Sequence, residues 1–226
     1  MSAFISGLER IYASLQAGST TDVNSDVIDL MRTSASLLGR QAEPLMVTQQ
    51  HPLGFFVCKW SLGGGRNLRL HLWSKDFDWT QEPGWEIHDH VFSFSSLVLL
   101  GALKSQTFET DELPLSDPRY SVYEVGYKGA NSSMNLVRSG VSLRLVTNTV
   151  ESRGTLYDMP AGVLHRSELI ADRAVTILAA QDAVTKLGAP RVVSEHHREV
   201  VSFDRSPASK LDVSDLLLEF ADELAR

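Results

Sequence analysis

The chain has 226 residues, of which 43% are hydrophobic and 22% charged, so it can bury a sizeable core and is neither wholly disordered nor a fibrous repeat. Its net charge of −7 argues against nucleic acid as a partner. It has no basic leader and no run of 18 apolar residues, which predicts a cytoplasmic protein that does not bind membranes. Because Cys58 is the single cysteine, any metal site must be built from histidines and carboxylates.

Apolar residues at helical spacing open and close the chain. They predict helices over 2–16 and about 22–40, the second capped by Asp22 or Asn24 and ending near Gly39. A similar pattern over 213–224 predicts a terminal helix. We therefore expect an N-terminal helical segment over 1–43 and a C-terminal helix over 206–226.

Between these helices the sequence changes to short runs of β-branched and aromatic residues separated by turn-forming residues. Many short strands in one stretch without a linker predict a single all-β barrel or sandwich over 44–205. The long interval between Gly101 and Gly154 leaves room for an extra hairpin over the barrel mouth. The predicted strands are 53–60, 67–74, 85–108, 119–126, 132–150, 154–159 and 173–181.

Three histidines stand where a metal site could form. His88 and His90 are two residues apart in a predicted strand, so their side chains share one face. His165 follows a turn that contains Pro160 and Gly162, and this turn could direct it toward the other two. On this pattern alone, a histidine pair exposed on a strand remains the alternative interpretation.

The segment around the third histidine resembles the second motif of the cupin superfamily. That motif has a glycine, then a proline, a glycine and a histidine at fixed spacing. Gly154, Pro160, Gly162 and His165 match it in full spacing, while Leu169 replaces the asparagine that usually ends it.

The segment around the first two histidines resembles the first cupin motif, with two departures. His88, His90 and the closing Gly101 match, but the opening glycine comes two residues late, at Gly84. Phe94 stands where the motif usually has its glutamate ligand. The chain therefore resembles a cupin without the carboxylate ligand, and the resemblance covers about residues 53–182.

The resemblance implies a double-stranded β-helix barrel, or jelly roll, with a metal inside. Cupins with three histidine ligands include non-haem iron dioxygenases of the cysteine dioxygenase type, in which Fe(II) acts with O₂. We accordingly expect an iron-dependent dioxygenase or related oxygenase with His88, His90 and His165 as ligands and a small organic substrate. Imidazole also binds Zn, Ni and related metals, so the ligands do not name the metal. A homodimer is expected by analogy with other cupins.

Three residues alternate along one predicted strand and share a face: Arg69, His71 and Trp73. If this face lines the cavity, Arg69 binds a substrate carboxylate through its two-pronged guanidinium and His71 lies near the metal. If the face is solvated instead, the three leucines that alternate with these residues form the core. Both interpretations stay open.

Two further residues are candidates for catalysis. Glu86 would share the face of the histidine pair as a ligand or general base, or lie at the rim as a solvated carboxylate. Tyr157 precedes His165, whereas thiol dioxygenases commonly place a tyrosine after the third histidine, so no cross-link to Cys58 is expected. If Glu86 and His71 both turn inward, a second metal fits and the protein resembles a dinuclear iron cupin monooxygenase.

The histidine site is also compatible with functions that do not use O₂. A Zn, Ni or Mn site could serve an isomerase or lyase, or the barrel could bind a small molecule without catalysis. The polar residues near the site but outside the ligand spacing do not decide between these functions. Asp89 points away from the histidine pair toward a supporting or surface contact, and His51, His196 and His197 are expected at the surface.

Overall fold

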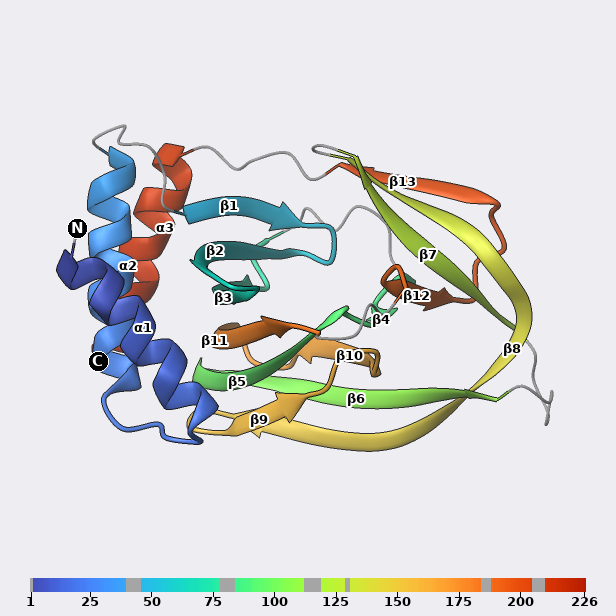
Figure 1. Ribbon diagram of the computed structural model, residues 1–226, viewed down its shortest axis with the longest axis horizontal. Helices are drawn as coiled ribbons and strands as arrows, with labels where there is room; N and C mark the ends of the chain where they lie inside the picture. The colour runs from blue at the N-terminus through green and yellow to red at the C-terminus, as the bar shows by residue number, and fades with distance from the viewer. Residues whose placement is uncertain are drawn as a thin grey trace.

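The computed structural model describes residues 2–39, 46–77, 84–111, 119–128, 131–183, 188–204 and 210–226. Two antiparallel sheets form the core, and helices at both ends of the chain pack on one of them, which confirms the predicted all-β barrel with terminal helices. The helices are α1 (Ser2–Gln16), α2 (Val23–Gly39) and α3 (Lys210–Leu224). Figure 1 shows them together at one end of the molecule, with β7, β8 and β13 at the other.

The first sheet has six strands in the order β1-β2-β3-β11-β5-β9, with antiparallel neighbours throughout. One of its faces packs under the three helices in the largest hydrophobic cluster, which includes Trp60, Leu70 and Ile177. The other face looks into the barrel. The strands are β1 (Met46–His51), β2 (Phe55–Gly63), β3 (Arg66–Ser74), β5 (Phe92–Leu100), β9 (Leu156–Met159) and β11 (Arg173–Asp182).

The second sheet has the order β13-β8-β6-β10-β4-β12-β7, and β7 also pairs with β8, so its pairings form a closed ring. The hairpin of β7 and β8 is the extra hairpin expected between Gly101 and Gly154. The strands are β4 (Ile87–His88), β6 (Ala102–Asp111), β7 (Tyr120–Lys128), β8 (Asn131–Ser152), β10 (Leu164–Leu169), β12 (Arg191–Ser194) and β13 (Val200–Asp204).

The structure corrects the strand prediction in two ways. The predicted run 85–108 is three strands, because the chain turns at Gly101, whose φ of 71° is in the left-handed region that favours glycine. In addition, β1, β10, β12 and β13 were not predicted, since their short mixed sequences carry little periodicity. The predicted boundaries at 43/44 and 205/206 lie outside the described residues and stay predictions.

Candidate metal centre

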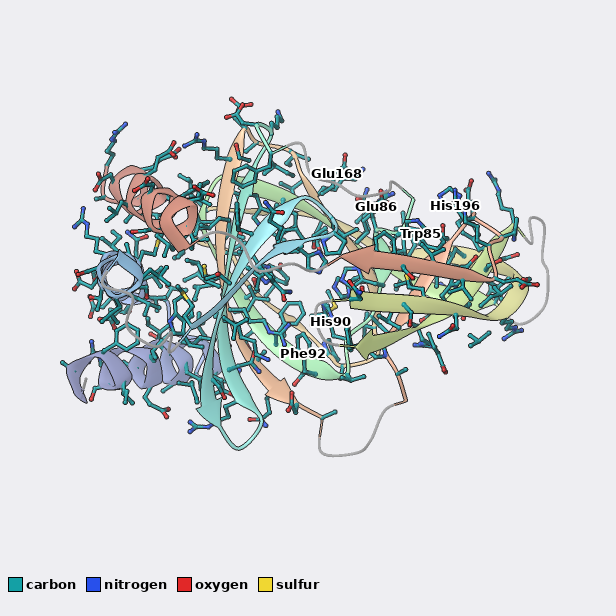
Figure 2. All side chains as sticks on the ribbon, turned by 90° about the horizontal axis from the view of Figure 1, so that it is seen from above. Trp85, Glu86, His90, Phe92, Glu168 and His196 are labelled. Atoms are coloured by element: carbon teal, nitrogen blue, oxygen red, sulfur yellow. The ribbon has the colours of Figure 1, made fainter. Side chains whose placement is uncertain are left out.

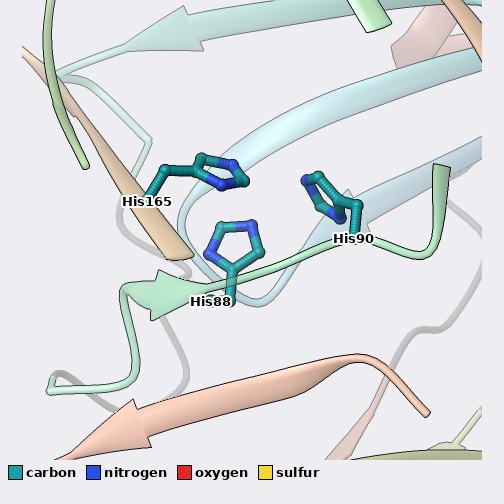
Figure 3. A group of neighbouring side chains, drawn as sticks. All are labelled: His88, His90 and His165. Carbon is teal, nitrogen blue, oxygen red and sulfur yellow. The ribbon is translucent and has the colours of Figure 1, made fainter. Parts of the chain in front are cut away.

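The three predicted histidines come together at the inner wall of the barrel. His88 ends β4, His90 follows it by two residues, and His165 on β10 is the register partner of His88. Their ring centroids are 4.7–5.0 Å apart, and one nitrogen from each ring lies within 4.8 Å of the others. Figure 3 shows the three rings turned toward a common point.

Backbone contacts fix the orientation of two of these rings. The Nδ1 of His88 lies 2.8 Å from the carbonyl oxygen of Glu86, and the Nδ1 of His165 lies 2.9 Å from that of Val163. Because a carbonyl oxygen can only accept a hydrogen bond, each Nδ1 carries the hydrogen and each Nε2 keeps its lone pair. Metal-binding histidines usually have this arrangement, so the donor set fits a divalent metal ion.

Burial keeps His90 and His165 neutral. It lowers the pKa of His165 to about 3, with a smaller effect from the neighbouring His88. The pKa of His90 is also well below its usual value, mainly because of burial and then because of His88 and His165. A metal ion needs neutral imidazole nitrogens, so these two histidines can bind one at neutral pH without first losing protons.

A hydrogen-bond network joins the two segments that carry the histidines. Asp89 is 4% exposed, and its carboxylate accepts hydrogen bonds from the backbone N and the Nε of Arg191 at 2.6 and 2.7 Å. Arg191 also donates through Nη2 to the carbonyl of Gly162 at 3.1 Å. Gly162 in turn donates its backbone N–H to the carbonyl of His90 at 2.8 Å. Asp89 thus makes the supporting contact expected of it.

The histidines open onto a cavity of about 430 Å³. Phe94, in the position of the usual glutamate, lines this cavity with its ring 6.2 Å from that of His165. It offers no ligand atom, so the histidines have an aromatic neighbour where the cupin motif has a carboxylate. The aromatic residues that line the cavity are Phe55, Trp73, Trp85, Phe92, Phe94, Tyr127, Tyr157 and Phe203.

The face formed by Arg69, His71 and Trp73 lines this cavity, and the alternating leucines of β3 are fully buried under the helices. This answers the question left open by the sequence, because β3 is covered on both sides. Arg69 donates from Nε to Asn67 Oδ1 at 2.7 Å, and its guanidinium lies 3.9 Å from the centroid of the Phe92 ring.

His71 and Glu86 do not meet the histidine triad as the dinuclear interpretation requires. Among the described residues, the one group of three or more potential ligands is His88, His90 and His165, without His71. The Glu86 carboxylate accepts a hydrogen bond from the backbone N of Gly84 at 2.9 Å and is not among the cavity residues. Glu86 lies one residue before β4, which begins at Ile87, so the alternation of the strand does not extend to it, and its role as a ligand or general base stays a prediction.

Tyr157 lies in the cavity wall, where β9 pairs with β5, and its ring is 6.4 Å from that of Phe94. Burial raises the pKa of its phenol, with a smaller opposing effect from Ser96. The phenol therefore stays protonated at neutral pH and can donate a hydrogen bond. Its predicted catalytic role remains a prediction.

The surface placement of the remaining histidines needs one correction. His51 lines the cavity and stacks on Phe55 at 4.3 Å between ring centroids. The inward position of His51 was missed because β1 was not predicted. Without that strand, the alternation of side chains that turns His51 inward could not be predicted either. His196 packs on Trp85 in the half of the molecule away from the helices (Figure 2). The Nδ1 of His197 lies 2.8 Å from Ser121 Oγ.

Comparison with known proteins finds only distant structural likenesses. No protein-family profile and no curated protein sequence matches the chain. One similar solved structure is a variant of oxalate decarboxylase from Bacillus subtilis, with 12% identity over 62% of this chain and 28% of that chain and a TM-score of 0.34. Another is hydroquinone 1,2-dioxygenase from Sphingomonas sp. TTNP3, with 16% identity over 54% of this chain and 64% of that chain and a TM-score of 0.31. A third is the capsular polysaccharide assembling protein CapF from Staphylococcus aureus, with 12% identity over 63% of this chain and 32% of that chain and a TM-score of 0.33.

At such low identity and with TM-scores below 0.5, these likenesses carry no conclusion about family or function. The match covers less than two thirds of each of these chains. Fold and site together define a cupin-like β-barrel with a three-histidine group facing its cavity. Within the described residues, no helix is both long enough and apolar enough to span a membrane.

Proposed function

We propose that this chain is a metal-dependent oxidoreductase, a mononuclear non-haem Fe(II) oxygenase that acts with O₂ on a small organic molecule. The observation that carries the proposal is the convergence of His88, His90 and His165, with two Nδ1 atoms held by backbone carbonyls and Phe94 in place of a carboxylate. Three neutral ligands leave the charge of a divalent ion uncompensated by the protein and leave coordination positions open to other molecules.

A bound ferrous ion would supply redox chemistry toward O₂, and the chain's own residues would control what reaches it. The aromatic wall formed by Phe92, Phe94 and Tyr157 limits water in the cavity. Tyr157, kept protonated by burial, can donate a hydrogen bond to a bound molecule or supply a proton. Arg69, on the same cavity surface, can orient an anionic group.

The test is anaerobic reconstitution with Fe(II), Zn(II), Ni(II) or Mn(II), followed by measurement of O₂ consumption against a panel of small organic acids and phenols. We expect substrate-dependent O₂ uptake with Fe(II) alone and none in His88→Ala. Turnover without O₂ in the Zn, Ni or Mn forms would instead indicate an isomerase or lyase and would overturn the oxygenase assignment.

A further inference from the structure

Two cationic side chains lie next to each other on the cavity surface of the first sheet. Lys59 on β2 and Arg69 on β3 are register partners, and both line the cavity. Lys59 was not a candidate from the sequence, because the inward face of β2 becomes clear only when its pairing with β3 is known. The strands therefore place two positive charges side by side in the wall of the cavity onto which the three histidines open.

Among the described residues, the cavity offers Lys59 little negative charge. Two carboxylates line the described part of the cavity, and one of them, Asp89, already accepts two hydrogen bonds from Arg191. The other, Asp182, acts on Lys59 from a distance, and among the described residues Lys59 forms no ion pair within 4.0 Å.

The energetics at Lys59 favour a bound anion. Partial burial lowers the pKa of Lys59, the charge of Arg69 lowers it further, and Asp182 opposes both effects. A lowered pKa means that the charged form is disfavoured where it stands. An anion placed between Lys59 and Arg69 would reverse this cost, because it attracts both charges in a partly desolvated setting.

The pair is linked to the metal centre by one aromatic ring. The guanidinium of Arg69 lies 3.9 Å from the centroid of Phe92, and the ring of His90 stacks on Phe92 at 4.5 Å with an interplanar angle of 15°. Since both groups cannot occupy the same face of the ring, Phe92 lies between them. Figure 2 shows His90 and Phe92 next to each other inside the molecule. A molecule held by the cations can therefore reach the histidines along an apolar surface.

We infer that Lys59 and Arg69 form an anion-binding subsite, and that the substrate is an organic carboxylate whose apolar body passes Phe92 and lies along Phe94 toward the histidines. Among the described residues, the one further cation that lines the cavity, Arg191, already binds Asp89, so a monoanionic carboxylate fits between Lys59 and Arg69 better than a dianionic phosphate, which would need a third cation. Calling this ligand the substrate rests on the proposed function, whereas binding of the anion does not need the metal.

The experiment uses the whole chain treated with a chelator, so that no metal can bind a carboxylate directly. Calorimetric titration compares benzoate, its uncharged analogue benzamide and the dianion phenyl phosphate. We expect benzoate to bind at least about tenfold more tightly than either of the other two. Lys59→Met should weaken benzoate binding by about tenfold without changing benzamide binding, and Lys59→Arg should keep the preference for benzoate.

The matched control is Lys75→Met, which removes the same charge from an exposed ion pair with Asp172 outside the cavity and should leave benzoate binding unchanged. Equal binding of benzoate and benzamide, or equal effects of the two methionine variants, would overturn the subsite. Tighter binding of phenyl phosphate would overturn the carboxylate assignment. If benzoate binds as expected but the iron form consumes no O₂ with any acid, the oxygenase proposal fails and the subsite stands.

Discussion

His88 and His165 are register partners on β4 and β10, and the Nδ1 of each ring lies beside the backbone carbonyl two residues earlier, just before its strand begins. The same local contact thus orients both rings, and sheet pairing sets the distance between them. This preorganisation means that a metal ion would not have to order the rings when it binds.

Arg191→Met should weaken metal binding without removing a ligand. The substitution deletes the side-chain bonds from Arg191 to Asp89 and to the Gly162 carbonyl, which join the segments carrying His90 and His165. Loss of such supporting contacts typically costs about 10–100-fold in metal affinity. Competition for Zn(II) with a coloured chelator measures this loss.

The control for this experiment is Arg144→Met, which breaks an exposed ion pair with Glu109 on the outer strands. It should bind zinc as the wild type does. Unchanged zinc affinity in Arg191→Met would show that the network does not position the histidines.

Phe94→Glu should convert the site toward the usual cupin ligand set. The new carboxylate would replace a buried ring that lies 5.9 Å from the His90 ring and 6.2 Å from the His165 ring. Without metal the charge is buried unpaired, so the melting temperature should fall, and added Zn(II) should raise it more than in the wild type.

Phe94→Gln is the matched control variant, because glutamine has nearly the same shape as glutamate but carries no charge. It should show the loss of stability without the additional rescue by Zn(II). If both variants respond equally to the metal, position 94 does not face the metal centre.

The metal-free protein should lose stability as the pH falls below about 6.5. Burial lowers the pKa of both His71 and His165 to about 3, so between these values the unfolded chain binds protons that the folded chain does not. The free energy of unfolding is therefore highest above pH 6.5 and decreases by up to about 1.4 kcal/mol per pH unit for each such histidine. Urea denaturation at several pH values measures this slope.

His71→Phe should reduce that slope by one histidine's share. Identical pH dependence in the wild type and His71→Phe would contradict the burial of a neutral His71.

Gly101→Ala should destabilise the barrel by about 2 kcal/mol or more. The glycine has a φ of 71°, and an added Cβ would overlap the backbone carbonyl oxygen of Arg173 on β11. Gly140→Ala is the comparison, because its φ of 72° is similar but nothing lies within 4 Å of an added Cβ. Equal losses in thermal denaturation would mean that backbone strain alone, and not the close approach, explains the effect.

The sequence predicted the three helices and the histidine triad because both depend on local spacing. Residues two apart on a strand share a face, and the turn before His165 contains a proline and a glycine at fixed positions. The sequence alone does not show whether Arg69 points into the barrel, because β3 has leucines on one face and mixed residues on the other. The helices pack on the leucine face, and this packing turns the face of Arg69 toward the cavity.

The missed residues depend on long-range pairing. His51 and Lys59 face the cavity because β1 pairs with β2 and β2 with β3 in a particular register. A register shift of one residue would turn His51 and Lys59 outward, and no local sequence pattern specifies which register the strands adopt. The direction of Glu86 could not be predicted for the related reason that β4 is only two residues long and does not keep a strand's alternation upstream of Ile87.

The most direct test of the metal centre is the metal content of the purified chain, measured by mass spectrometry for the wild type and for His88→Ala, His90→Ala and His165→Ala after equilibration with Fe(II) or Zn(II). We expect about one metal ion per wild-type chain, a loss of most of it in each of the three variants, and wild-type content in His197→Ala. Wild-type metal content in any of the three variants, while all fold normally, would contradict a site built from these histidines.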